Sequence, residues 1–389
     1  METRILKLKH VLHPLQTARV ASTRLLAHAR MQRFAYRSKR RFRGDPRYQP
    51  ERVAEGFAPR SESSPDDVSL LERISRAYIR SASHPECDRE CYAPTQWWRQ
   101  FRESALKRVI RALQQGDISS LRSMYSNFFR DPCSAGLIGV PYGMTRAYFQ
   151  GPMRDVHRHC YMGHALCRID YWLAETHGRF QLADLRGPNL GNPFGVPING
   201  VFVAHDSEYQ HYCAHEILSR LATSPRVVAE VGAGYGGMAY YLLRDGGPII
   251  YINFDLPESI ALSSYYLLKS FPTARFLLYG ESDLTSEALA TSDVILLPAF
   301  AMATLPAHSI TVTFSSHVMG DLSQSAMAEY LNQVVRITRQ CFLYSGNVRG
   351  GERIREAGQG HLKLLTVRPT AWNRHMANVR EGEYVFALQ

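Results

Sequence analysis

Closely spaced glycines follow a lone glutamate in the stretch VVAEVGAGYGGMAYYLL, residues 227–243, where an apolar run gives way to a helical pattern. Glycine lets a ligand press against the backbone where a Cβ would collide. Gly232, Gly234 and Gly237 fit the G-x-G-x-x-G fingerprint of dinucleotide sites, and Asp255 follows 18 residues later. The turn therefore predicts a cofactor that carries ribose.

Glu230 separates two cofactor classes, because Glu230, Gly232, Gly234 and Gly236 also fit an E-x-G-x-G-x-G turn. A carboxylate at the end of a buried strand needs a partner, and a phosphate would repel it. The ammonium of a methionine moiety suits it, which favours S-adenosylmethionine (SAM) over NAD. Asp255 would accept hydrogen bonds from the ribose hydroxyls of either cofactor. An NAD-dependent oxidoreductase and a tight turn without a ligand remain alternatives.

His317 is the candidate general base. It comes directly after the apolar run ITVTF, and in a parallel sheet the strand ends at the carboxyl edge face the ligand. A hydroxyl is a poor nucleophile until a base begins to remove its proton. Asp321, one helical turn later, would hold the imidazole in the productive tautomer. The alternatives are a capping or packing role for His317, and an N-cap role for Asp321 before SQSAMAEYLNQVV.

No metal site is assigned. A divalent metal is possible at oxygen and nitrogen ligands whose spacing is not diagnostic: Glu281, Asp283, His317 and Asp321. A second set shares one helical face, but four ligands along one helix do not close a tetrahedron: His157, Cys160, His164 and Cys167. Cys87 and Cys91 lack a partner pair. In the segment 205–217, three residues could reach a ligand or simply belong to a connecting helix: His205, His211 and Tyr212.

The elements that must position these residues fall into two regions. From about residue 216, short apolar runs alternate with helical ones, which predicts a doubly wound, mainly parallel α/β sheet over 216–389. The run ARFLLYG is one strand more than such a sheet needs, and the last two runs suggest an antiparallel hairpin at its edge. Residues 61–215 form a mainly helical cap or substrate region. There Asp66 or Asp67 would cap the first helix, and LRGPNLGNPFGVPING reads as a loop.

Charge is concentrated at the N-terminus. The net charge is +11, and residues 1–60 hold 15 Lys and Arg against 4 Asp and Glu, so the rest of the chain is neutral. We expect a basic, partly disordered arm that can reach anionic lipid, RNA or an acidic partner, and a body that does not bind nucleic acid. Seven irregularly spaced cysteines, and the absence of a long apolar run or clean signal peptide, favour a cytoplasmic protein.

The blocks EVGAGYGGMAYYLL, YINFDLPESIALSSYYLLKSFP, LLYGES and VILLPAFAMATLP resemble those of the sugar O-methyltransferase family of SAM-dependent enzymes. The similarity extends over about residues 95–350. It implies a class I methyltransferase fold, Rossmann-like in character, and SAM as the methyl donor. The acceptor it implies is a hydroxyl of a free sugar, a nucleotide-linked sugar, a glycan or a glycosylated metabolite.

The resemblance also implies roles for single residues. Glu230 would orient the methionine end, Leu256 would lie beside the adenine, and the loop at Ala299 and Phe300 would wall it. Ser315 departs from the family, where an asparagine is expected before Ser-His. Two further alternatives therefore stay open: a methyltransferase for a phenolic or other small metabolite, and a degenerate module that binds SAM without catalysis.

Overall fold

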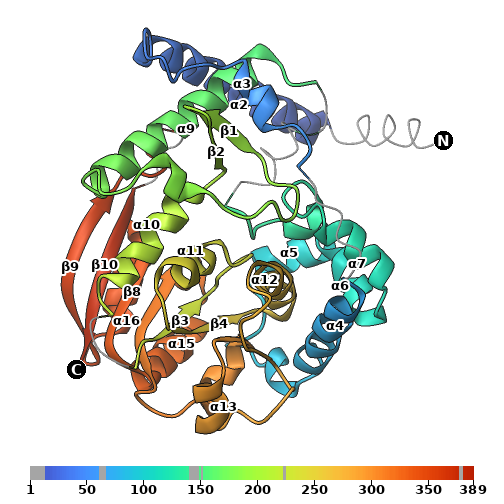
Figure 1. Ribbon diagram of the computed structural model, residues 1–389, viewed down its shortest axis with the longest axis vertical. Helices are drawn as coiled ribbons and strands as arrows, with labels where there is room; N and C mark the ends of the chain where they lie inside the picture. Colours follow the sequence, from blue (N-terminus) through green and yellow to red (C-terminus); the bar gives the residue numbers. More distant parts are fainter. Residues whose placement is uncertain (1–13, 61–66, 140–148, 150–151, 222–224, 376–379) are drawn as a thin grey trace.

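An eight-stranded sheet forms the centre of the protein, with strand order β5-β6-β4-β3-β7-β8-β10-β9 (Figure 1). The computed structural model describes residues 14–60, 67–139, 149, 152–221, 225–375 and 380–389, with side chains from residue 28 onward. The strands are β3 (Val227–Val231), β4 (Ile250–Asp255), β5 (Phe276–Leu278), β6 (Val294–Pro298), β7 (Ile310–Ser316), β8 (Thr338–Asn347), β9 (Leu362–Thr370) and β10 (Glu381–Leu388).

The sheet is doubly wound, as predicted. From β3 the chain moves outward through β4 and β6, then returns to β7 on the other side of β3, and all these neighbours pair in parallel. The strand order thus reverses between β3 and β7, which is where ligands bind in such sheets. The short strand β5 lies outside β6 at one edge, which confirms ARFLLYG as the added strand. β10 is antiparallel to both β8 and β9, which confirms the edge hairpin.

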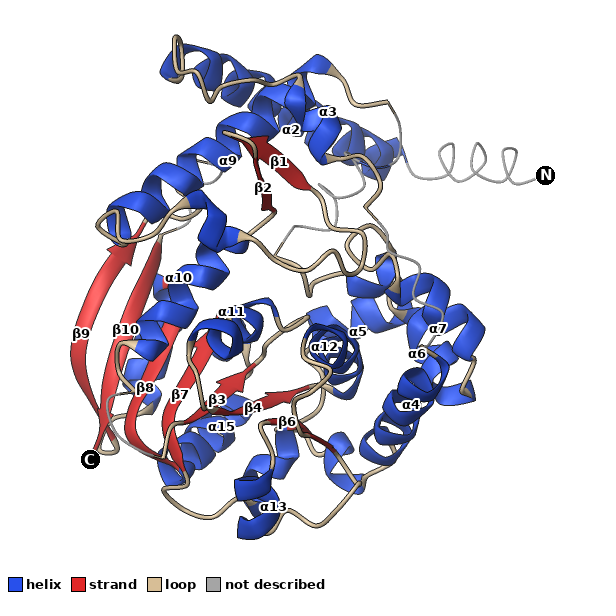
Figure 2. Ribbon diagram, in the orientation of Figure 1, coloured by secondary structure: helices blue, strands red, loops and turns tan. Residues whose placement is uncertain are grey.

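Helices cover both faces of the sheet (Figure 2). The helices α10 (Ser207–Leu218), α11 (Gly237–Asp245) and α12 (Pro257–Ser270) contribute to one buried apolar cluster. The elements η4 (Ala299–Thr304), α15 (Gln324–Ile337) and α16 (Val348–Ala357) contribute to the other, and α13 (Ser286–Thr291) and α14 (Val318–Asp321) are short connections. Successive β3 residues alternate between the two, with Val228 in the first and Ala229 in the second. A parallel sheet buried on both sides explains the nearly continuous apolar runs.

The region before the sheet is mainly helical. It contains α4 (Val68–Ala82), η1 (Pro85–Asp88), α5 (Gln96–Glu103), α6 (Lys107–Gln115), α7 (Ile118–Tyr125), η2 (Pro132–Ser134), α9 (Asp155–Glu175) and η3 (Leu182–Leu185). The predicted loop was wrong in part, because it contains β1 (Gly195–Ile198), which pairs with β2 (Val201–Ala204). Asn199 and Gly200, both at positive φ, form the two-residue turn of this hairpin.

Asp67 stands at the predicted N-cap of α4, but its side chain caps nothing. It is buried and accepts hydrogen bonds from Tyr265 Oη at 3.2 Å and Lys269 Nζ at 2.5 Å, both on α12. The carboxylate therefore ties α4 to α12 rather than to its own helix. Asp66 lies outside the described residues.

The basic arm is folded where it is described. It forms α2 (Pro14–Arg41), which lies beside α9 in Figure 1, and α3 (Arg52–Gly56). Phe42 and Val53 are buried in the main apolar cluster, and Cys160 Sγ of α9 donates to Met31 O at 3.2 Å. The expectation of a disordered arm is thus wrong for residues 28–60, because apolar residues between the basic ones pack onto α9. Residues 1–13 lie outside the described part.

All seven cysteines carry free thiols. None of the described helices combines the length and the apolar character needed to cross a bilayer.

Candidate functional site

A cavity of about 530 Å³ lies over the carboxyl ends of the parallel strands. Residues at the ends of β3, β4, β7 and β8 form its floor: Glu230 to Gly234, Asp255 and Leu256, Ser316 to Val318, and Ser345 and Gly346. Because β10 runs antiparallel, its first residue, Glu381, reaches the same edge. The cavity therefore occupies the switch point of the sheet.

Glu230 lies in this floor and is 2% exposed. Its Oε2 accepts a hydrogen bond from Tyr251 Oη at 2.5 Å. Burial raises the pKa of Glu230 to about 8, with a smaller contribution in the same direction from Asp255 and an opposing one from the Tyr251 hydrogen bond. A nearby cation would stabilise the ionised form of such a buried carboxyl.

Asp255 joins two parts of the floor. Its Oδ1 accepts from Leu256 N at 2.7 Å and its Oδ2 accepts from Gly234 N at 3.3 Å. These backbone bonds lower its pKa, but burial outweighs them and raises the pKa to about 7. The carboxyl thus fixes the glycine turn against the end of β4, and Leu256 beside it lines the cavity.

The glycine turn lines the cavity, and at two of its glycines a Cβ would also collide with other protein atoms. A Cβ on Gly232 would lie 2.4 Å from Val318 Cγ2, and one on Gly234 would lie 2.6 Å from the Leu137 carbonyl oxygen. That carbonyl also accepts from Tyr235 N at 3.3 Å. Gly236 does not line the cavity, because it caps α11 at positive φ beside Leu267. Gly236 was predicted to let the cofactor approach the backbone. In the structure it provides the positive-φ residue that starts α11.

His317 lines the cavity at the turn between β7 and α14. Its backbone has φ 62° and ψ −46°, and its N–H donates to Ser345 O at 2.8 Å. Burial lowers the pKa of His317, although the carboxylates of Glu381 and Asp321 oppose the shift. The imidazole is therefore neutral near pH 7, as a base requires. A residue held at positive φ beside a cavity is also typical of functional sites.

Asp321 lines the cavity but is exposed at the end of α14. Among the described residues, no hydrogen bond joins its carboxylate to the imidazole of His317. It acts on the imidazole through its charge. The N-cap alternative is wrong, because Ser323 Oγ accepts from Ala326 N at 3.2 Å and caps α15. Ser315 is fully buried, and its hydroxyl donates to Val231 O at 2.9 Å and accepts from Met319 N at 3.4 Å, so it braces the turn.

Ala299 and Phe300 were predicted to wall the adenine, but they do not line the cavity, so the structure does not bring them to Leu256 and Asp255. The chain enters η4 directly after β6. As a result Phe300 stacks on His84, with ring centroids 4.6 Å apart. The segment 91–101 covers the cavity instead, with Tyr92, Trp97 and Trp98. Trp98 Nε1 donates to Glu258 Oε1 of α12 at 2.7 Å, which holds α5 in place. The only sequence signal for this cover was its aromatic content.

Helix α10 reaches the cavity with a different face from the one predicted. His205, His211 and Tyr212 do not line it, and Tyr212 Oη instead donates to Glu383 Oε2 at 2.9 Å. The lining residues are Asp206, Tyr209, Gln210 and Cys213, at i, i+3, i+4 and i+7. Tyr209 Oη bonds Ser316 Oγ at 2.8 Å and Ser345 Oγ at 2.9 Å, which fixes the helix over the strand ends.

A polar wall missed by the sequence analysis faces His317. Arg168 of α9 is 3% exposed, forms an ion pair with Asp206, and donates to Glu208 Oε1 at 2.5 Å and Asn373 Oδ1 at 3.2 Å. Asn373 N and Nδ2 donate to the two oxygens of Glu381 at 3.1 and 2.9 Å. The neighbouring Trp372 lines the cavity beside Tyr209, with ring centroids 5.2 Å apart.

The predicted metal ligands do not converge among the described residues. Glu281 pairs with Arg73 at 2.6 Å, away from the cavity that His317 and Asp321 line, and Asp283 does not line it either. On α9, His164 Nδ1 bonds His375 Nε2 at 2.7 Å, while Cys160 bonds the backbone of α2. Cys87 Sγ donates to Ser81 O at 3.0 Å.

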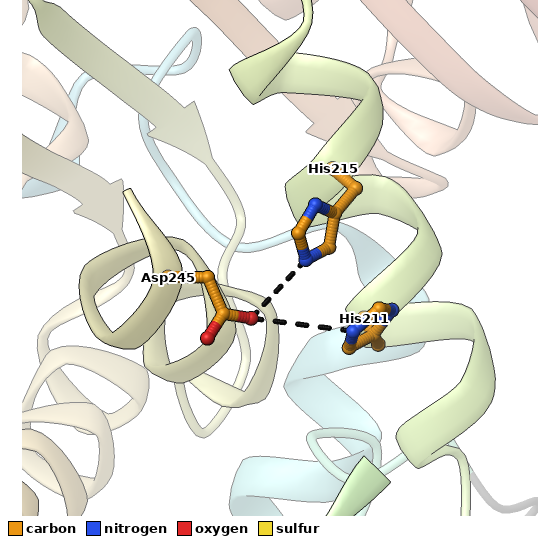
Figure 3. Close-up of side chains that lie close together, drawn as sticks. All are labelled: His211, His215 and Asp245. Atoms are coloured by element: carbon orange, nitrogen blue, oxygen red, sulfur yellow. Dashed lines mark hydrogen bonds and ion pairs between the residues drawn. The ribbon is translucent and has the colours of Figure 1, made fainter. Parts of the chain in front are cut away.

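His211, His215 and Asp245 form a close cluster, with possible ligand atoms within 4.8 Å of one another (Figure 3). Trp172 Nε1 donates to His211 Nδ1 at 3.3 Å, and burial lowers the pKa of His211 to about 3. The neutral ring therefore carries its proton on Nε2, which faces Asp245 Oδ2 at 4.0 Å and cannot ligate a metal in that state. Asp245 is also paired with Arg244 at 2.6 Å. The cluster is a polar contact between α10 and α11.

No family model matches the chain, and no curated protein matches it. Among solved structures, a SAM-dependent methyltransferase from Aquifex aeolicus is 14% identical, covering 46% of this chain and 93% of its own, with a TM-score of 0.33. A TehB-like SAM-dependent methyltransferase from Corynebacterium glutamicum is 15% identical over 45% of this chain and 87% of its own, with a TM-score of 0.32. The SAM-bound magnesium protoporphyrin IX methyltransferase from Synechocystis is 9% identical over 47% and 82%, with a TM-score of 0.33. Similarities with TM-scores this low carry no argument about function.

Proposed function

We propose that the protein is a SAM-dependent O-methyltransferase that acts on a sugar hydroxyl. The observation that carries the proposal is the arrangement of Glu230, Asp255 and His317 around one cavity at the switch point of the sheet. The two carboxyls would suit a cationic, ribose-bearing cofactor, and the neutral imidazole at the end of the neighbouring strand β7 would serve the acceptor.

The cavity fits SAM better than NAD. A dinucleotide pyrophosphate needs free backbone N–H groups at the glycine turn or a cation. Here the Tyr235 N–H donates to Leu137 O and Gly234 N donates to Asp255, and Glu230 is an acid where a pyrophosphate needs a cation. The ammonium of SAM would instead meet Glu230, its ribose would meet Asp255, and its adenine would lie near Leu256. Ser259, buried in the same lining and interacting with the Asp255 carboxyl, offers a further polar contact.

When bound, SAM would supply a methyl group whose sulfur keeps the C–S electron pair as the acceptor oxygen takes the carbon. The protein contributes alignment and a base. His317 accepts the hydroxyl proton on an imidazole nitrogen, and the nearby carboxylates of Asp321 and Glu381 stabilise the imidazolium that results. The cover formed by Trp97, Trp98 and Tyr92 limits access of water.

Two observations support a sugar as the acceptor. The sequence resemblance points to sugar hydroxyls, and the wall that faces His317 combines aromatic rings with hydrogen-bonding groups: Tyr209, Trp372, Asn373, Asp206 and Glu381. Flat apolar faces with a few fixed polar groups suit a ring that carries hydroxyls. We also propose a cytoplasmic location, since seven free thiols fit a reducing compartment.

Isothermal titration with SAM and with NAD tests the cofactor, and methyl transfer from labelled SAM to a sugar panel tests the reaction. We expect saturable binding of SAM, none of NAD, and products heavier by one CH2 group. Binding of NAD in place of SAM would reject the proposal. Binding of SAM without transfer to any sugar or phenolic acceptor would leave only a module that binds SAM.

A further inference from the structure

The charges that line the cavity are strongly unbalanced. In the described part of the lining, Arg168 is the only Lys or Arg, whereas the acids are Asp206, Glu230, Asp255, Asp321 and Glu381. Arg374 and Arg380 flank the wall in sequence but are exposed and do not line the cavity. Glu230 and Asp255 belong to the cofactor half, so the acceptor half still holds three acids against one guanidinium.

That guanidinium is already neutralised. Arg168 pairs with Asp206 and Glu208 and also donates to Asn373 Oδ1. Buried at 3% exposure, it has little freedom to turn toward a ligand. A phosphate on the acceptor would therefore meet no free cation among the described lining residues and would face carboxylates in a medium that screens poorly.

Among the described residues, no Lys or Arg forms an ion pair with Glu381, and Arg168 acts on it only through its charge at longer range. Glu381 is 6% exposed, and its described partners are the backbone N–H and side-chain amide of Asn373. Because Asn373 Oδ1 accepts from Arg168, the amide nitrogen must point at Glu381, which fixes the carboxylate in the wall. An ionised carboxylate has about four acceptor positions, so Glu381 can still take donors from a ligand. Trp372 beside it is 2% exposed, and its indole N–H has no acceptor among the described residues.

We propose that the acceptor is an amino sugar whose ammonium binds Glu381 beside the Trp372 ring, and that phosphorylated and nucleotide-linked sugars are excluded. This deepens the proposed function and rests on it. A buried carboxylate without a cation is costly, and a ligand ammonium supplies the missing charge.

The test is a titration of matched sugars into protein saturated with S-adenosylhomocysteine. For the gluco, galacto and manno configurations, the panel contains the free amine, the N-acetyl form and the 6-phosphate. We expect at least one free amine to bind at least tenfold more tightly than its N-acetyl and phosphorylated counterparts. Glu381→Gln should abolish that preference without changing the affinity for S-adenosylhomocysteine. Glu356→Gln, which removes an equal charge from the exposed face of α16, should leave the preference intact.

Three results would overturn the inference: phosphorylated sugars that bind as tightly as the amines, an amine preference that survives Glu381→Gln, or no binding of any panel amine. Each can be told apart from failure of the proposed function. That failure would appear as no binding of SAM or S-adenosylhomocysteine to the unaltered protein, or as no methyl transfer from SAM to any sugar, with or without an amine.

Discussion

Two buried carboxyls give the cofactor half of the cavity an unusual titration. Burial raises the pKa of Glu230 to about 8 and that of Asp255 to about 7, so both are largely or partly protonated at neutral pH without a ligand. A bound ammonium favours the ionised form of Glu230. Binding of SAM should therefore release protons.

We expect the affinity for SAM to rise as the pH increases through about 7 to 8, since the carboxyls then lose their protons without help from the ligand. Titration calorimetry at pH 7, in buffers with different ionisation enthalpies, measures the protons released. Glu230→Gln should remove most of the pH dependence and weaken binding. An affinity that falls over this range, or net proton uptake, would contradict the assignment.

Asp255 offers a simpler test of the ribose contact. Asp255→Ala removes a charged acceptor, so binding of SAM should weaken by about 1.5–3 kcal/mol, measured by titration calorimetry. Circular dichroism should stay near that of the unaltered protein. Asp293→Ala, at the opposite end of the same part of the sheet, serves as the control because Asp293 pairs with exposed Arg275. Equal affinities in the two variants would show that Asp255 does not bind ribose.

His308, at the other end of strand β7, provides a matched control for His317. His308 also has positive φ, but it precedes β7 and so lies at the other end of the strand. His317→Ala should lower the single-turnover rate of methyl transfer by about 100-fold or more at saturating SAM, while His308→Ala should not. Asp321→Asn should cost less than His317→Ala.

The pH profile follows from the lowered pKa of His317. The base acts when deprotonated, so the rate should rise with pH through a midpoint below the ordinary histidine value of about 6.5 and then level off. A His317→Ala rate equal to that of the unaltered enzyme would remove this residue from catalysis.

At the scale of elements, α9 and α10 are joined under the acceptor wall by Arg168. Arg168→Met would leave Asp206 and Glu208 buried without a cation, so we expect the free energy of unfolding to fall by about 3–5 kcal/mol at pH 7.5. Burial raises the pKa of Asp206 to about 6. The loss should therefore be smaller at pH 5.5, where Asp206 can take up a proton. Urea denaturation measures both values, and exposed Arg179→Met is the control. An equal loss at both pH values would contradict this explanation.

The same elements show where sequence patterns succeed and fail. Strand runs such as VVAEV and VILLP predicted the sheet because both of its faces are buried. The pattern of acids and glycines singled out Glu230 and Asp255, and both line the cavity. Periodicity identified α10 but not which face turns to the cavity, so Tyr209 was passed over in favour of Tyr212. The contact of Trp98 with Glu258 joins residues 160 positions apart, and no local pattern reports such a pairing.

At the scale of the whole molecule, the N-terminal segment is both a structural part and a charged surface. Deleting residues 1–60 would remove the buried side chains of Phe42, Val53 and Phe57, so we expect truncation to destabilise the protein. The charge therefore has to be tested by substitution rather than by deletion.

Within α2, exposed arginines follow the spacing i, i+3, i+7 and i+10, which places Arg30, Arg33, Arg37 and Arg40 on one helical face. The opposite face buries Ala35 and Ser38. Since the excess positive charge of the chain lies in this segment, we expect the arginine face to bind anionic lipid surfaces. Each arginine near such a surface contributes about 1 kcal/mol.

Replacing all four arginines with glutamine should therefore weaken binding to vesicles that contain phosphatidylserine by about a thousandfold, as four times about 1 kcal/mol predicts. Vesicle co-sedimentation measures the effect, and binding of the unaltered protein should weaken as salt increases. Affinity for SAM should not change, because α2 does not line the cavity. Vesicles of neutral lipid are the control, because binding to them measures hydrophobic association without the electrostatic contribution. Equal binding of the quadruple variant and the unaltered protein to anionic vesicles would show that this face serves no lipid surface.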